Sequence, residues 1–189
     1  MDTVPHHRIE ELRSERIAIV PHDPSWSERY SELEAKLSRS LPDDLIQRIA
    51  HIGSTAVPGL SAKPIIDVQV EVSSLDRVRR EVVPIMRDLA FEYIWRPTMG
   101  EAAPFYAWFI GRNTKGERTS HIHMVEPDAA SADRILFRDF LRINVEEIAR
   151  YEDLKHRLSS AHPNDRAAYT LGKTGFVMDV LRRAKLQRS

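Results

Sequence analysis

The sequence predicts an α+β (α/β) fold, in which a small mixed β-sheet is flanked by helices and followed by a helical carboxy-terminal region. Strand-like apolar runs and helical periodicities alternate over the first two thirds of the 189 residues. From Ser131 onward the apolar residues recur at helical spacing. Because the length suits one domain, we expect a single domain over residues 17–189, with a helical extension over about 131–189. Residues 1–16 are expected to form a flexible amino-terminal arm, and the alternative is a loose helical lead-in.

The composition excludes several classes of protein. Lys plus Arg and Asp plus Glu each number 28, so no overall basic field favours nucleic-acid binding, although a local basic patch is allowed. The chain has no cysteine, which excludes a disulfide, a zinc–thiolate site and a cysteine nucleophile. No apolar run approaches the roughly 20 residues of a membrane span, and the charged start has no signal-peptide core. We therefore expect a cytoplasmic protein.

The first part of the chain predicts an edge strand and one long helix. Residues 17–20 form a short apolar run that suits a strand. Asp23 and Pro24 then indicate a helix start, because Asp accepts hydrogen bonds from free backbone N–H groups and Pro suits the first helical position. Core side chains follow at helical spacing to about Ser40, at Trp26, Tyr30, Leu33 and Leu37.

The stretch from His51 to Val72 organises the chain and predicts strand, loop and strand. The apolar segment 45–52 breaks at Gly53 and Ser54, and a run rich in Ile and Val follows over residues 65–72. Because strand side chains alternate between two faces, the second strand has one apolar face and one polar face. The polar face carries Asp67, Gln69 and Glu71.

The remaining elements are predicted from capping residues, breakers and periodicity. Ser73 or Ser74 caps a helix to about Ala90, and Pro84 predicts a kink within it. Strands are expected at residues 91–95, 105–110 and 119–126, with a loop over 96–104 and a hairpin between the last two strands. Helices are expected from Ser131, over Val145–Ala161, and from Asn164 or Asp165 to about Leu186.

A resemblance adds a fold family to this outline. Gly-Ser, about a dozen residues and then an acid within an apolar strand is similar to the signature of the nucleotidyltransferase superfamily. The longer string HIGSTAVPGLSAKPIIDV, which starts at His51, resembles one branch, the GrpB family (UPF0157). Further similarity is in IVPHDPSW, His121-Ile122-His123, FRDFLR, and Tyr169 with Lys173, so the resemblance covers roughly residues 17–182. It implies a nucleotidyltransferase-like sheet with a helical carboxy-terminal region.

The resemblance also assigns a phosphate site to the loop between the two central strands. Glycine allows a ligand to approach the backbone closely, and hydroxyl and N–H groups hold phosphate oxygens. In the superfamily this turn cradles the triphosphate of a nucleotide. We therefore expect Gly53, Ser54 and Thr55 to bind phosphate. The alternative is a tight turn with a capping serine, which the dipeptide alone would favour.

The catalytic positions depart from the superfamily pattern. That pattern is Asp, an apolar residue, then a second acid, and both carboxylates bind Mg²⁺. Here the positions are Asp67 and Gln69, so one ligand charge is missing. His121 and His123 lie on one face of a later strand, where the superfamily often supplies a third carboxylate. We expect Asp67, His121 and His123 to bind Mg²⁺ or Mn²⁺, and two imidazoles favour a softer metal. The alternative is a pair of structural histidines.

Cations of the helical region complete the predicted site. In the superfamily a helical region closes over the cleft and supplies cations to the phosphates. By position in the resemblance, the candidates are Arg138, Lys155 and Lys173. Lys63 precedes the Asp67 strand closely enough to reach either phosphate or Asp67. The alternative for each is a solvated side chain on a helix surface. A histidine-triad hydrolase is disfavoured because the third position of such a triad is Val125.

Two hypotheses about function follow. The first is a nucleotidyltransferase of the GrpB type, with Asp67 and Gln69 at the catalytic positions, that passes a nucleotidyl group from a nucleoside triphosphate to a small-molecule acceptor. The second is a non-catalytic module that keeps the fold and binds a nucleotide or a coenzyme-A-like ligand, which the amide of Gln69 favours. A third, an interaction module without a ligand, predicts no thermal shift with any nucleotide. The sequence identifies neither the acceptor nor the oligomeric state.

Overall fold

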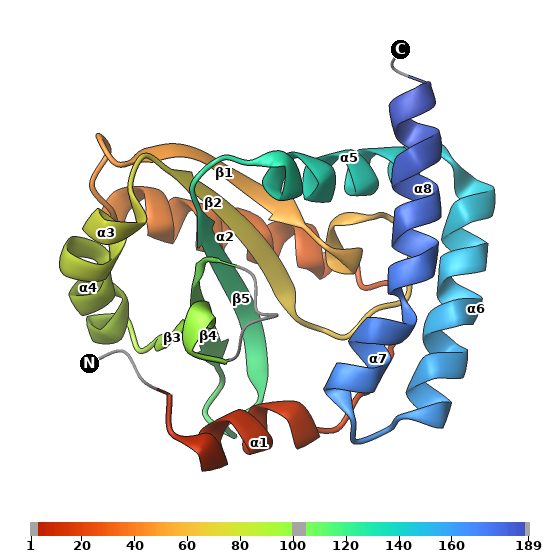
Figure 1. The fold of residues 1–189 in the computed structure, drawn as a ribbon, viewed down its shortest axis with the longest axis horizontal. Coiled ribbons are helices and arrows are strands. Elements are labelled where there is room, and N and C mark those ends of the chain that lie inside the picture. The colour runs from red at the N-terminus through yellow and green to blue at the C-terminus, as the bar shows by residue number, and fades with distance from the viewer. Residues whose placement is uncertain (1–3, 100–104, 188–189) are drawn as a thin grey trace.

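One mixed β-sheet lies at the centre of the molecule, as the computed structural model in Figure 1 shows. The structure describes residues 4–99 and 105–187. Its strands are β1 (Ile46–Ile52), β2 (Ile66–Val72), β3 (Glu92–Trp95), β4 (Ala107–Arg112) and β5 (Arg118–Val125). They lie in the order β1-β2-β5-β4-β3. Strands β2 and β5 are parallel and the other neighbouring pairs are antiparallel, which confirms the predicted mixed sheet.

Helices surround the sheet and fill the second half of the chain. They are α1 (His6–Ser14), α2 (Ser25–Ser40), α3 (Leu75–Arg77), α4 (Val83–Asp88), α5 (Ala129–Ile143), α6 (Val145–Ala161), α7 (Arg166–Gly172) and α8 (Thr174–Leu186). Helices α6, α7 and α8 gather on one side of the sheet, and the ion pair between Arg183 and Glu147 joins α8 to α6 (Figure 1). The predicted helical carboxy-terminal region is therefore confirmed.

The main hydrophobic core lies on the apolar face of β2. Its strand residues are buried and pack against α2 and the segment from α3 to α4. These strand residues are Ile66, Val68, Val70 and Val72. Trp26 and Leu37 face them from α2 and are fully buried. Because side chains alternate along a strand, the opposite face of β2 carries Asp67, Gln69 and Glu71 toward the side on which α5 lies.

Several predicted helix signals have the expected contacts. Asp23 accepts a hydrogen bond from the backbone N–H of Ser25 at 2.9 Å, at the start of α2. Ser74 accepts from the N–H of Arg77 and caps α3. Pro84 lies in the first turn of α4, and the turn before it, Val78–Val82, is π-helical. A proline cannot donate a backbone hydrogen bond, so the distortion falls where the sequence predicts a kink.

Of the two forms expected for the start of the chain, the structure has the helix and not the flexible arm. Residues 6–14 of that segment form α1, and the side chain of Leu12 is buried. Ionic contacts from distant parts of the chain hold this segment. Arg8 pairs with Glu92 at 2.6 Å, and Glu15 forms ion pairs with three arginines. These partners lie 84 or more positions away in the sequence, so no local pattern could indicate them.

Other boundaries differ more modestly from the prediction. The expected edge strand at 17–20 is a single bridge between Val20 and Ala62. The expected last helix is divided into α7 and α8, which meet at Lys173. The predicted loop 96–104 begins with a 3₁₀ turn, and its residues 100–104 lie outside the described residues. Within the described part of the chain, no helix is long and apolar enough to cross a membrane.

Candidate functional site

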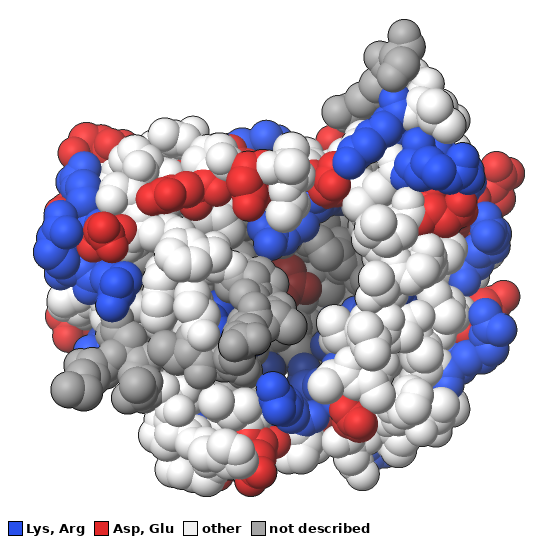
Figure 2. Space-filling view, in the orientation of Figure 1, with Lys and Arg blue, Asp and Glu red and all other residues white. Residues whose placement is uncertain are grey.

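A cavity of about 1080 Å³ opens between the polar face of the sheet and the helices of the second half. Figure 2 shows this face hollowed, with blue Lys and Arg side chains at the margins of the hollow and a red carboxylate inside it. The described lining includes seven Lys or Arg side chains, whereas Asp67 is its one acid. A concave site with this balance of charge favours an anionic ligand.

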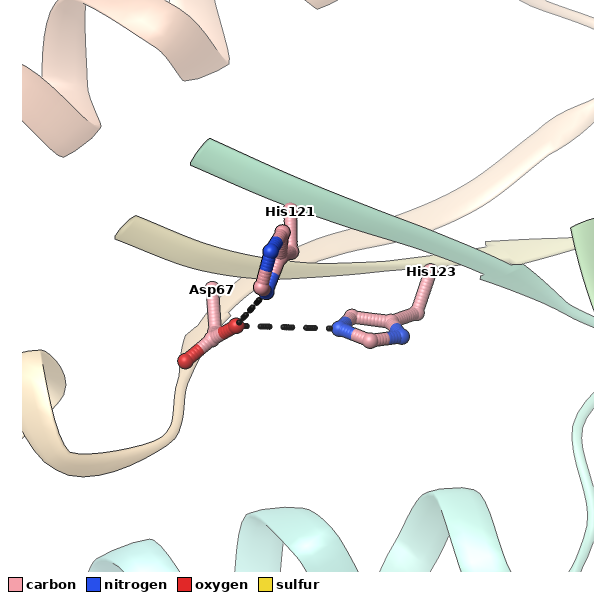
Figure 3. A group of neighbouring side chains, drawn as sticks. All are labelled: Asp67, His121 and His123. Carbon is pink, nitrogen blue, oxygen red and sulfur yellow. Dashed lines mark hydrogen bonds and ion pairs between the residues drawn. The ribbon is translucent and has the colours of Figure 1, made fainter. Parts of the chain in front are cut away.

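The register of two parallel strands brings an aspartate and two histidines together on the cavity floor. Asp67 on β2 is the Cα partner of His121 on β5, and His123 follows two residues later on the same face. The Nδ1 atom of His121 lies 3.0 Å from Asp67 Oδ1, and the Nε2 atom of His123 lies 3.7 Å from it (Figure 3). The two strands thus place three potential metal ligands around one point.

The protonation states of this cluster suit metal ligands. Burial favours a raised pKa for Asp67, but its contacts with His121 and His123 outweigh that effect and hold the pKa well below the usual range. Burial lowers the pKa of His121 to about 4 and lowers that of His123 as well. At neutral pH the carboxylate is therefore ionised and both imidazoles are neutral. Metal binding requires these forms of both groups.

The Gly53–Ser54 turn lies directly against Asp67. Gly53 has φ +71°, and a Cβ placed on it would lie 2.7 Å from Asp67 Oδ2. Only glycine combines that backbone conformation with so close an approach. Ser54 lies beside Tyr151, whose pKa burial raises to about 12. Both Gly53 and Ser54 line the cavity, as the sequence predicts.

Thr55 also borders the cavity, but its hydroxyl is occupied within the loop. It donates to the carbonyl of Ile65 at 3.2 Å and lies 3.0 Å from Nε2 of His51. The His51 ring stacks on Tyr30 with centroids 4.6 Å apart, and burial lowers its pKa to about 4. The hydroxyl hydrogen of Thr55 points to a carbonyl, so the neutral His51 donates to its oxygen. Thr55 thereby joins the two ends of the loop.

The three predicted lysines meet on one wall of the cavity. Lys63 and Lys173 lie over the buried ring of Tyr169, with Nζ atoms 5.4 and 4.6 Å from its centroid. Lys155 is almost fully buried and donates to the carbonyl of Ser61. Burial, with the nearby charge of Lys173, lowers the pKa of both Lys63 and Lys155 to about 7. Lys173 thus raises the cost of charging both of the other lysines, and a bound anion would offset that cost.

Arg138 does not line the cavity. Its guanidinium donates to the carbonyl of His51 at 2.7 Å and pairs with Asp139. Arg142, one turn later on α5, donates to the carbonyl of Ala56 at 2.8 Å. The two arginines therefore contact the backbone on both sides of the Gly53–Ser54 turn. This geometry gives Arg138 a role in positioning the turn instead of direct contact with a ligand.

Gln69 is also directed away from the cavity. Its side chain is fully buried and its amide nitrogen donates to Glu71 Oε1 at 3.0 Å and to the carbonyl of Ser131 at 3.1 Å. Arg134 donates to its amide oxygen at 3.0 Å. These bonds connect β2 to the first turns of α5 and satisfy the amide. The geometry makes Gln69 a support for the cluster.

Sequence reasoning missed a second set of cavity residues. Trp108 and Tyr106 on and beside β4 border the histidines, and Trp108 is the strand partner of His123. Further cations come from distant elements, namely Arg13, Arg96, Arg118 and Arg166. Side chains alternate between the two faces of β4, so the sequence could have placed Trp108 on the face of the histidines. That inference needed the register of the hairpin between β4 and β5, which the sequence did not show.

Comparison with known proteins agrees with this architecture. The family described as GrpB protein matches residues 16–183, which is most of the chain. The chain belongs to the GrpB family. A UPF0157 protein of Pseudomonas aeruginosa is 38% identical over 173 residues, which are 90% of this chain and 68% of that protein. The UPF0157 protein YqkA of Bacillus subtilis is 31% identical over 90% of this chain and 48% of its own length.

The GrpB fold is also seen in a solved structure. A crystal structure of the conserved protein GrpB from Enterococcus faecalis aligns with a TM-score of 0.75 and 28% identity, over 90% of this chain and 99% of that one. A dephospho-CoA kinase of Mycolicibacterium paratuberculosis is 26% identical over 89% of this chain, and the match covers 46% of that protein. The GrpB region is therefore found both as most of a chain and as about half of a longer one.

Proposed function

We propose that the cavity binds a nucleoside triphosphate and that the protein transfers a nucleotidyl group from it to a small-molecule acceptor. The observation that carries this proposal is the position of Asp67, which lies 3.0 and 3.7 Å from two imidazoles and against the glycine turn, on the floor of a cavity with cationic walls. Nucleotidyl transfer needs a polyanion to be held close to groups that bind a divalent cation.

The residues have distinct roles in this proposal. The phosphates are held by three lysines that lie together on one wall, Lys63, Lys155 and Lys173. Asp67 is the one acid among the described lining residues, so this wall carries an excess of positive charge. Ser54 presents its hydroxyl to the phosphates at the turn, where it lies beside Tyr151. In the reaction an acceptor hydroxyl or amine gives up its proton to water and bonds to the α-phosphorus, while the bond from the α-phosphorus to the α,β-bridging oxygen breaks and pyrophosphate leaves. The aromatic rings of Tyr106 and Trp108 limit water at the opposite wall.

Asp67, His121 and His123 would hold a divalent cation. When bound, such a cation neutralises charge on the phosphates and lowers the pKa of an attacking hydroxyl. The cluster fits a cation of this kind because its three donor atoms converge and its carboxylate is ionised. The backbone pairing of β2 with β5 holds these three side chains next to one another.

A second candidate is a non-catalytic module that binds a nucleotide or a coenzyme-A-like ligand. It is favoured by Gln69, which stands where the superfamily has a second carboxylate and which is engaged with α5. The similarity to a protein described as dephospho-CoA kinase also points to nucleotide-containing ligands. Both candidates predict a nucleotide in the cavity, and only the first predicts turnover.

The experiment is isothermal titration of ATP, GTP, CTP and UTP, first with Mg²⁺ and then with Mn²⁺, followed by a pyrophosphate-release assay. We expect micromolar binding that Asp67→Asn weakens at least about tenfold, whereas Asp76→Asn on the exposed end of α3 leaves it unchanged. Release of pyrophosphate with an acceptor mixture supports the transferase. Tight binding without release supports the binding module, and the absence of binding by all four nucleotides contradicts both.

A further inference from the structure

We propose that the cluster of Asp67, His121 and His123 selects a transition-metal dication, such as Mn²⁺, Fe²⁺, Co²⁺ or Zn²⁺, over Mg²⁺. This inference deepens the proposed function by naming the class of cation at the same site. Its main observation is the donor set on the cavity floor, which contains one carboxylate and two imidazoles (Figure 3).

The chemistry of the donors separates the two classes of cation. Mg²⁺ prefers carboxylate, phosphate and water oxygens in an octahedral shell and binds imidazole poorly. Imidazole nitrogen suits Mn²⁺, Fe²⁺, Co²⁺ and Zn²⁺, and two histidines with one carboxylate on one face leave other positions open for a ligand. The cluster matches this second arrangement, because His121 and His123 both turn a ring nitrogen toward Asp67 (Figure 3).

The spacing of the donors suits such a cation. Ligands about 2.1 Å from a metal lie roughly 3.0 Å apart at adjacent octahedral positions and about 3.4 Å apart in a tetrahedron. The two distances from Asp67 Oδ1 to the imidazole nitrogens are 3.0 and 3.7 Å. All three donor atoms lie within 4.8 Å of one another. A separation as wide as 4.8 Å exceeds both ideal spacings, so rotation of the side chains would have to bring the donors together around a cation.

Among the described residues, no second carboxylate lines the cavity to make the site favourable for Mg²⁺. Asp67 is the one acid among the described residues that line the cavity. Glu71 accepts from the amide of Gln69, and Gln69 is held in turn by Arg134 and the carbonyl of Ser131. These contacts keep the residues at the superfamily's second ligand position out of the shell. The metal site therefore extends from β2 to β5.

The rings of both histidines are held in place by Trp108. Its ring packs edge-to-face on His121 with centroids 5.1 Å apart and stacks at 14° on His123 with centroids 6.5 Å apart. Tyr106 packs against His123 from the same strand region at 5.1 Å. Packing of this kind fixes ring orientation before the cation binds, which lowers the entropic cost of binding. A site whose ligands are already in position distinguishes between cations more strongly than a flexible site does.

The test is metal titration of the full chain, stripped with EDTA, in the absence of nucleotide. Calorimetry with MnCl₂, CoCl₂, ZnCl₂ and MgCl₂ gives the affinities, and visible absorption of Co²⁺ reports nitrogen ligation independently of any reaction. We expect one site per chain and an affinity for Co²⁺ or Zn²⁺ at least about 100-fold above that for Mg²⁺. An affinity for Mg²⁺ within tenfold of that for Mn²⁺ overturns the inference.

Variants assign the site and exclude a site near the start of the chain. His121→Gln and His123→Gln should each remove Co²⁺ absorption and lower Zn²⁺ affinity at least tenfold, with folding checked by circular dichroism. His6→Gln with His7→Gln is the matched control, because His6 lies beside Glu10 on α1 and offers a competing surface site. Loss of the Co²⁺ signal in that control, with retention in the cluster variants, overturns the inference.

The outcome is separable from that of the proposed function. If nucleotides bind with Mg²⁺ and no transition metal binds by itself, the metal inference fails while the nucleotide proposal stands. If Co²⁺ and Zn²⁺ bind to the cluster but no nucleotide binds, the metal inference stands and the proposed function fails. Because the metal titration compares cations on the unmodified chain, its result does not depend on the folding of any variant.

Discussion

Gly53 and Asp67 lie in contact across the loop that joins β1 to β2, and a methyl group on Gly53 would lie 2.7 Å from Asp67 Oδ2. The Gly-Ser pair and the acid are separated in sequence by about a dozen residues, yet they form one surface. The dozen residues between the Gly-Ser pair and the acid are therefore the loop that the chain needs to turn from β1 into β2.

Gly53→Ala should disable the site through this contact. We expect a loss of about 1–3 kcal/mol in the free energy of unfolding from the positive φ, and at least a tenfold loss of metal and nucleotide affinity from the displaced carboxylate. Gly59→Ala is the matched control, because Gly59 has φ +79° with open space around its Cβ position. Equal affinity losses in the two variants would contradict the contact with Asp67. Urea unfolding and calorimetry measure both effects.

Lys63 should lower the stability of the ligand-free protein, although it contributes to nucleotide binding. Burial lowers its pKa to about 7 from a usual value of 10.5, so the unfolded chain binds more protons between those pH values. Stability should therefore rise with pH across that window. Lys63→Met should make the rise shallower, add about 1 kcal/mol of stability near pH 7, and weaken nucleotide binding. Unfolding from pH 6 to 10 tests this, with the exposed Lys115→Met as the control.

Arg138 should act on the loop and not on the ligand. Its bond to the carbonyl of His51 predicts that Arg138→Gln costs about 1–2 kcal/mol of unfolding free energy. Nucleotide affinity should fall less than in Lys63→Gln, because the loop is loosened while the cations of the cavity remain. Chemical denaturation and titration of the two variants measure these quantities. An affinity loss equal to that of Lys63→Gln, at unchanged stability, would indicate direct contact with phosphate.

Gln69→Glu should not restore a second metal-binding acid. The new carboxylate would lie against Glu71 and the carbonyl of Ser131, where the amide nitrogen now donates. We expect a stability loss of about 1–3 kcal/mol from the lost donor and the buried like charge. The preference among cations should be unchanged. Calorimetric titration with Mg²⁺ provides the check, and a gain of tenfold or more in Mg²⁺ affinity would show that residue 69 reaches the cation.

Glu15 should anchor α1 to the rest of the chain. Its carboxylate contacts Arg112, Arg118 and Arg166, and burial is outweighed by these charges, so its pKa is lowered. A lowered pKa stabilises the fold above the usual value of 4.5, and this contribution is lost as pH falls. Glu15→Gln should cost about 1–3 kcal/mol near pH 7 and little near pH 3.

The more exposed Glu11 provides the control for that variant, because it pairs with Arg8 within α1. Glu11→Gln should change stability by less than about 0.5 kcal/mol at either pH, as is usual for surface pairs. Thermal unfolding at the two pH values compares the variants. A loss for Glu15→Gln that persists at pH 3 would mean that its charge is not the source of the stability.

Sequence reasoning identified the residues of the cavity floor but not all of their roles. Gly53, Ser54, Asp67, His121 and His123 all line the cavity. Gln69 and Arg138, by contrast, are bound to distant backbone carbonyls. The resemblance to the family indicated that residues 69 and 138 belong to the site. It could not indicate where each side chain points, because that depends on how α5 packs against β1 and β2. Those contacts span 62 and 87 positions of sequence.

The sequence by itself determined the local elements, because they depend on periodicity and capping within a few residues. It predicted α6 at about Val145–Ala161, a cap of α7 at Asn164 or Asp165, and the polar face of β2, and the structure has all three, with Asp165 as the cap. Only the tertiary structure decided which side chains meet: the parallel pairing of β2 with β5, the lysines around Tyr169 and the packing of α1. Such contacts depend on strand register and helix packing over long separations, which local spacing does not encode.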